Sequence, residues 1–201
     1  MTGVISKDPR SLDDLAAAGS HDLDDGTRRL LQHAVDEAAR LLKADGAMVY
    51  LVDREAQTLH FGVDAGIRNA EARELVRSLS MPLGHGLFGT AIERAEVVTT
   101  TDYRRDRSFT HSPVADRIVS VANMRSMAVA PLIAEGEALG ALGAYTSTID
   151  DFDEAEIALL RALADHAAGA IWNARLIARL NASEQRYRFL VENAPDLIWS
   201  V

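Results

Sequence analysis

A block of closely spaced glycines, Gly84–Gly89, constrains the fold of this chain more than any other feature of its sequence. The block reads G-x-G-x-x-G, and Asp102 follows roughly 20 residues on, as in a dinucleotide-binding fingerprint. That fold needs a buried parallel strand before the glycines, yet residues 70–80 read as a polar helix and only residues 81–83 remain for a strand. Pro82 also removes one backbone donor there. The glycines therefore indicate a backbone turn, and an NAD-dependent enzyme is the least favoured of three hypotheses.

The composition favours one globular domain that binds neither nucleic acid nor anionic lipid. The chain has 201 residues, of which 48% are hydrophobic, enough for a proper core. It carries 21 Lys and Arg against 30 Asp and Glu, a formal net charge of −9. A surface of this sign repels both nucleic acid and anionic membranes.

Neither a membrane span nor a signal peptide is expected, so a cytoplasmic location is the default prediction. No stretch reaches about 18 consecutive apolar residues, and residues 1–19 lack the basic start and apolar run of a signal peptide. The chain has no cysteine. Disulfides, a thiolate nucleophile, iron–sulfur clusters and cysteine-ligated zinc are thereby excluded.

Hydrophobic periodicity and turn residues predict an α+β fold built on antiparallel hairpins. Apolar residues at helical spacing predict a first helix that ends before Gly46, a candidate C-cap glycine. Alternation in the second strand places Leu59, Phe61 and Val63 on one face. The predicted strands are 47–52 paired with 58–63, then 97–101, then 125–133 paired with 138–146; the predicted helices are 27–44, 87–94, 112–121 and 153 to about 194.

Several separate blocks of sequence resemble a GAF domain, in the order in which that family carries them. They are Gly86–Gly89 with Val97, Val98, Asp102, Asp106 and Phe109; residues 125–132; residues 140–145; and Phe152 with residues 159–160, 170–171 and 173–176. Together they span residues 26–180. Independent blocks in the right order are much harder to obtain by chance than one short glycine motif.

The resemblance implies an antiparallel sheet with the first and last helices on one face. Short helices and loops of residues 68–122 would cover the other face and close a ligand pocket. The candidate ligand contacts, chosen by loop position and side-chain type, are Phe88, Tyr103, Phe109, His111, Arg117 and Met127. For Phe88 and Met127, packing in the hydrophobic core is the alternative role.

The resemblance also narrows the ligand to an unidentified small molecule. Without cysteine the chain matches neither the members that attach a bilin covalently nor those that reduce free methionine sulfoxide. Residues 121–123 lack the histidine of haem-binding members, and only Phe152 survives clearly from the cyclic-nucleotide signature, so we expect neither ligand. For His85 and His111, a solvated or hydrogen-bonded side chain is the alternative to a metal ligand, and no metal site is assigned. No catalytic constellation is present, so we expect a regulatory domain rather than an enzyme.

The last predicted helix carries apolar residues at alternating spacings of three and four. Such a heptad pattern predicts a homodimer through this helix together with the first helix. Packing of the same residues onto the domain's own sheet is the alternative. Acidic residues 150–154 suit the start of this helix. The predicted seam is Ile157, Leu160, Ala164, Ala167, Ile171, Ala174 and Ala178.

Residues 182–201 resemble the opening of a PAS domain, and residues 1–25 read as a flexible acidic lead. The GAF-like domain would then be residues 26–181. GAF followed by PAS is similar to the sensory half of bacterial sensor histidine kinases, with diguanylate cyclases as the next host. Two further hypotheses follow: a ligand sensor, which we favour, and a dimerising relay module whose pocket is filled by its own side chains.

Overall fold

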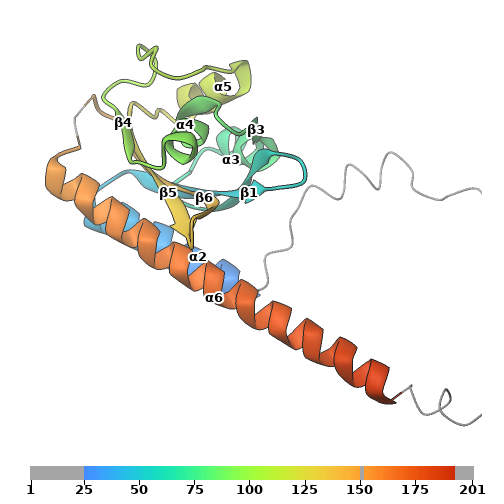
Figure 1. Ribbon diagram of the computed structural model, residues 1–201. Helices are drawn as coiled ribbons and strands as arrows, with labels where there is room; N and C mark the ends of the chain where they lie inside the picture. The colour runs from blue at the N-terminus through green and yellow to red at the C-terminus, as the bar shows by residue number, and fades with distance from the viewer. Residues whose placement is uncertain (1–24, 150–151, 193–201) are drawn as a thin grey trace, which may run out of the picture.

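The fold is a six-stranded antiparallel sheet with helices on both faces (Figure 1). The computed structural model describes residues 25–149 and 152–192. The strand order is β3-β2-β1-β6-β5-β4, so the predicted α+β class with an antiparallel sheet is confirmed. In chain order the elements are α2 (Asp25–Leu41), β1 (Gly46–Asp53), β2 (Thr58–Ala65), α3 (Ala70–Ser78), β3 (Ser80–Pro82), α4 (Gly86–Arg94), β4 (Val98–Thr100), α5 (Pro113–Val121), β5 (Ser126–Ala134), β6 (Glu137–Thr146) and α6 (Glu154–Glu192).

Two layers of helices cover the sheet. Figure 1 shows α2 and α6 side by side on one face, which we call the helix face. The helices α3, α4 and α5 cover the opposite face, called here the loop face. This is the arrangement that the sequence resemblance implied.

The central strand β1 is buried on both faces, which explains its unbroken apolar sequence. Met48 and Tyr50 pack into the core under the loop face. Val49 and Leu51 pack into a separate core under α2 and α6. The sheet therefore separates two hydrophobic cores, and side chains of one strand alternate between them.

A β-bulge in the β1–β2 pair overturns one prediction about faces. Val49 pairs with Val63 but Tyr50 pairs with Phe61, so Gly62 is an extra residue in β2. A bulge shifts the alternation by one. Phe61 consequently packs on the loop-face core with Leu59, while Val63 lies in the helix-face core. The prediction that all three share one face is wrong.

The end of the first helix also differs from the prediction. The left-handed residue after α2 is Lys43, with φ of 49°, and α2 ends at Leu41. Gly46 instead opens β1, where a Cβ atom would collide with the Ala65 carbonyl oxygen and the Tyr145 hydroxyl. Close packing at a strand start, and not a helix cap, explains this glycine.

The helix α6 begins with a reciprocal cap. The Asp153 backbone N–H donates to the Glu156 carboxylate at 2.9 Å, and the Glu156 N–H donates to Asp153 Oδ1 at 2.8 Å. Asp150 and Asp151 lie outside the described residues, as do residues 1–24 and 193–201. Within the ranges that the structure describes, no helix is both long and apolar enough to cross a membrane.

The middle of α6 packs on the chain's own sheet. Leu160, Ala164, Ala167 and Ile171 are at most 2% exposed and belong to the helix-face core. Ile157 and Ala174 are half-buried, and the side chain of Ala178 lies outside those described. The four buried seam residues therefore serve the intrachain core, the alternative that the sequence left open. Any contact of α6 with a second chain must use other residues.

Candidate functional site

A cavity of about 310 Å³ lies on the loop face of the sheet. Met48, Tyr50 and Met127 from the sheet line it on one side. α4, α5 and the loop of residues 101–112 line it on the other sides. Pockets that hold small ligands span about 300–1,000 Å³, so this cavity suits a small organic molecule.

The structure brings four of the six predicted contact residues to this cavity. Phe109 lies behind the wall, where its ring stacks on His111 at a centroid distance of 4.9 Å. Arg117 forms an ion pair with Glu71 of α3 at 2.7 Å. Neither residue lines the cavity, contrary to the prediction. The residues that do are Phe88, Tyr103, His111 and Met127.

His111 is held by two hydrogen bonds and two ring contacts. Its Nδ1 lies 2.8 Å from Asp116 Oδ1, and its Nε2 lies 2.8 Å from the Asp106 carbonyl oxygen. Both ring nitrogens therefore face acceptor oxygens, one on α5 and one in the loop itself. Tyr103 meets the ring edge-on at 4.9 Å. His111 therefore fixes the loop and has no nitrogen left for a metal or haem.

The loop of residues 101–112 is tied down near both ends. At its start, Arg125 donates two hydrogen bonds to the Asp102 carboxylate, at 2.8 and 3.1 Å. These bonds hold the pKa of Asp102 below its ordinary value of 3.8. Near its other end, the Gly86 N–H donates to Thr110 Oγ1 at 3.1 Å. The loop is thus joined to β5 and to the start of α4.

Two buried tyrosines supply hydroxyl groups beside the cavity. Tyr50 is 2% exposed and Tyr103 is 4% exposed, and burial raises the pKa of both hydroxyls. Tyr50 donates a long hydrogen bond to the Val76 carbonyl at 3.4 Å. Tyr103 lines the cavity from the loop of residues 101–112. Its neutral hydroxyl is therefore a candidate contact for an occupant.

Ser126 joins the loop to the segment that leads toward α6. Its side chain is fully buried, and its Oγ lies 2.6 Å from the Thr101 carbonyl oxygen and 2.8 Å from that of Thr148. One hydroxyl hydrogen can serve only one of these acceptors at a time. Thr101 begins the loop, and Thr148 follows the end of β6. The two segments consequently share a single donor.

The family of the chain follows from a comparison of its sequence with family models. The model described as the GAF domain matches residues 25–171. This chain belongs to the GAF family. No curated protein matches its sequence.

Solved GAF-fold structures support the same fold at low sequence identity. A GAF domain of a phosphoenolpyruvate-protein phosphotransferase from Coxiella burnetii is 22% identical, with a TM-score of 0.66 over 83% of this chain and 94% of that one. A domain of a protein described as a two-component sensor histidine kinase from Sinorhizobium meliloti is 18% identical, with a TM-score of 0.59 over 73% and 91%. A free methionine-R-sulfoxide reductase from Neisseria meningitidis is 21% identical, with a TM-score of 0.60 over 82% and 86%.

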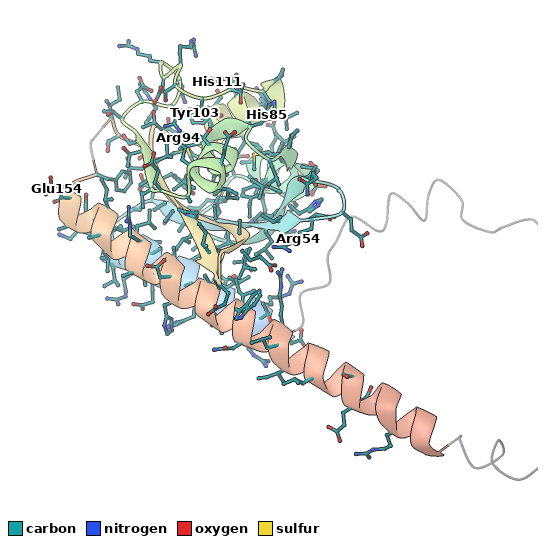
Figure 2. All side chains as sticks on the ribbon, in the orientation of Figure 1. Arg54, His85, Arg94, Tyr103, His111 and Glu154 are labelled. Atoms are coloured by element: carbon teal, nitrogen blue, oxygen red, sulfur yellow. The ribbon has the colours of Figure 1, made fainter. Side chains whose placement is uncertain are left out.

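The histidines of this GAF domain do not form a metal centre in the part that the structure describes. His85 lines the cavity, and its Nδ1 lies 3.3 Å from the Leu83 carbonyl oxygen. Figure 2 shows His85, Tyr103 and His111 on the side of the sheet away from α6. No group of three or more His, Cys, Asp or Glu among the described residues is placed to hold a metal ion.

Sequence reasoning missed several residues of the GAF cavity. Tyr50 lies in β1, a strand that is buried on both faces. The hydrophobic pattern of this strand therefore did not predict on which side of the sheet Tyr50 packs. Its alternation with Met48 and Val52, which share its core, was the available signal. The remaining missed methionines come from short segments without clear periodicity, namely Met81 and Met124.

Proposed function

We propose that this GAF domain is a small-molecule-sensing regulatory module of a bacterial signal-transduction protein, with a sensor histidine kinase as the favoured host. The observation that carries the proposal is the cavity itself, which the domain's own side chains leave open beside the buried Tyr103 hydroxyl. The Tyr103 hydroxyl offers such an occupant a hydrogen-bonding group. The fold likeness to a domain of a protein described as a sensor histidine kinase supports the choice of host.

The occupant would act through the loop of residues 101–112. Tyr103 and His111 line the cavity and belong to this loop. Its start is bonded to Arg125 and shares the Ser126 hydroxyl with Thr148. A ligand that favours one position of the loop therefore favours one hydrogen-bonding state of Ser126. A change there reaches the segment before α6 without any movement of the sheet.

The output end is the second half of α6, which projects beyond the sheet in Figure 1. Its described apolar side chains remain exposed: Leu176 by 40%, Ile177 by 59% and Leu180 by 69%. In our proposal these residues pair with a second copy, in a cytoplasmic homodimer that passes the signal to a following PAS domain. This proposed seam overlaps the end of the heptad, at Ala174 and Ala178, because Leu160, Ala164, Ala167 and Ile171 pack on the sheet.

A ligand screen with a cavity-filling variant tests the sensing role. Ala115 lines the cavity from α5, and Ala115→Phe would occupy the space of a ligand. Val114→Phe is the matched control, because Val114 lies on the same helix with 42% exposure and does not line the cavity. We expect some compounds of a metabolite library to raise the melting temperature of the wild-type chain and of Val114→Phe, but not of Ala115→Phe.

The opposite result would favour the relay module. If no compound stabilises the wild-type chain, or if every compound stabilises Ala115→Phe equally, then the cavity is not a ligand site. Circular dichroism of Ala115→Phe confirms that the variant is folded before the comparison is made.

A further inference from the structure

Methionines gather around this one cavity. The described residues contain four, and all four line it. They come from β1, β3, the segment before β5, and β5 itself, so no local sequence repeat brings them together. Thioether sulfurs are polarizable and make favourable contacts with aromatic rings. The four are Met48, Met81, Met124 and Met127.

Aromatic side chains complete the same wall. Tyr50 and Phe88 meet edge-on with their centroids 4.9 Å apart, and Tyr103 lies on the loop side. Rings prefer offset or edge-to-face contacts with other rings. An aromatic guest would therefore find sulfur atoms and ring partners around it, whereas a saturated guest of the same shape would gain burial alone.

The size of the cavity sets the size of the guest. A protein cavity of about 150 Å³ with apolar walls holds one benzene molecule. The cavity here measures about 310 Å³, roughly twice as much, which suits two fused rings.

The charge of the lining selects against ionic guests. Among the described residues, no Lys, Arg, Asp or Glu side chain lines the cavity. Arg104, Arg107 and Asp116 line a neighbouring hollow of about 250 Å³ instead, and Asp116 already pairs with His111. An ion in the cavity would be buried without a counter-charge, which is costly. The Tyr103 hydroxyl can still exchange one hydrogen bond with a neutral polar group.

We propose that the cavity takes a neutral two-ring aromatic molecule with a single hydroxyl or carbonyl group. This inference rests on the proposed sensing function and adds the chemical class of the ligand.

Three probes with the same fused two-ring carbon skeleton test the ligand class, by isothermal titration calorimetry on the 201-residue chain. 2-Naphthol has the proposed chemistry, decahydro-2-naphthol has the same carbon skeleton without the flat aromatic rings, and naphthalene-2-sulfonate carries a charge. We expect 2-naphthol to bind the wild-type chain and Val114→Phe with similar affinity. Its binding to Ala115→Phe should be at least about tenfold weaker. The saturated alcohol should bind at least about fivefold more weakly, and the sulfonate at least about tenfold more weakly.

Two further variants separate the sulfur atoms from the shape of the cavity. Met124→Leu with Met127→Leu keeps the volume and removes two sulfurs. It should weaken 2-naphthol by about three- to tenfold and leave the saturated alcohol unchanged. Tyr103→Phe should weaken both alcohols, since each loses the same hydrogen bond.

Each contrary result has a separate meaning. Equal binding of the two alcohols would overturn the aromatic class, and tighter binding of the sulfonate would overturn the neutral class. If 2-naphthol fails to bind while the library yields a ligand that Ala115→Phe excludes, the ligand class falls and the sensing function stands. If the library also yields none, both fall.

Discussion

Ser126 is the residue where the cavity loop and the route to α6 meet. Its buried hydroxyl lies within hydrogen-bond distance of two carbonyls, from Thr101 and Thr148. It can donate to only one of them at a time, and the Thr148 carbonyl also accepts a hydrogen bond from Thr146 Oγ1 at 3.0 Å. In the proposed function, Ser126 is the residue that couples the loop to the segment before α6.

Removal of this hydroxyl should destabilise the domain. We expect Ser126→Ala to lower the free energy of unfolding by about 1 kcal/mol or more, since the buried Ser126 hydroxyl and its hydrogen bonds to the Thr101 and Thr148 carbonyls are lost. Urea denaturation measures the change. The exposed Ser78, whose hydroxyl bonds the Leu75 carbonyl, is the control, and Ser78→Ala should stay within about 0.5 kcal/mol of the wild type. Equal effects at the two serines would contradict the role given to Ser126.

Asp102 should make the stability of the domain depend on pH in the acid range. Hydrogen bonds from Arg125 keep its pKa in the folded chain below the ordinary 3.8. A depressed pKa contributes stability at neutral pH, and this contribution is lost as the pH falls below 3.8 toward the folded pKa. Urea unfolding between neutral pH and pH 2 should show a smaller loss for Asp102→Asn than for the wild type. The double variant Asp102→Asn with Arg125→Gln should show the same dependence of unfolding free energy on pH as Asp102→Asn alone, because the titrating carboxylate is already absent.

The contact residues of the cavity could be predicted only where side-chain type and loop position agreed. Tyr103 and His111 were found in this way. Arg117 was placed wrongly because its partner, Glu71, lies 46 residues away on another helix. Phe109 lies in the right loop, but its ring faces His111. Long-range partners of this kind leave no trace in local periodicity.

At the scale of elements, α6 has two parts with different tasks. Its first half packs on β5 and α2, with Ala167 fully buried. Its second half projects from the domain and exposes apolar residues (Figure 1). A continuous helix with one anchored half can carry a displacement from the domain to whatever follows.

The anchored half should not tolerate a charge. Ala167→Glu would bury a carboxylate in the helix-face core, and we expect a loss of at least about 3 kcal/mol in unfolding free energy. Ala174→Glu, at a half-buried position of the same helix, should cost much less. Thermal denaturation followed by circular dichroism compares the two. Equal losses would mean that the first half is not anchored as described.

The projecting half should carry the dimer contact. We expect Ile177→Glu combined with Leu180→Glu to produce monomers in light scattering, with the melting curve of the domain unchanged. A wild-type dimer that persists in this variant would rule out the proposed seam.

Most helices and strands could be predicted from the sequence. The side of the sheet on which each side chain packs was harder to predict. Ser112 and Pro113 correctly marked the start of α5. The face of Val63 was missed because the bulge at Gly62 follows from pairing with β1, which alternation within one strand does not reveal. Four positions of the predicted heptad in α6 are buried, but a stripe of small residues does not say whether a sheet or a second helix covers it.

At the scale of the whole molecule, the sheet separates the cavity from the long helix α6. The loop face holds the cavity, and the helix face holds α2 and α6. In the proposed function, the two sides communicate through Ser126 and the residues after β6. This division lets ligand and output be altered independently.

A native mass spectrum of the 201-residue chain, recorded beside that of Ala115→Phe, tests the central claim most directly. We expect the wild-type chain, purified from cells without added ligand, to carry a small non-covalent mass that Ala115→Phe has lost. If the two spectra show the same bound mass, or both show the bare chain, then the cavity is not the site of a sensed small molecule.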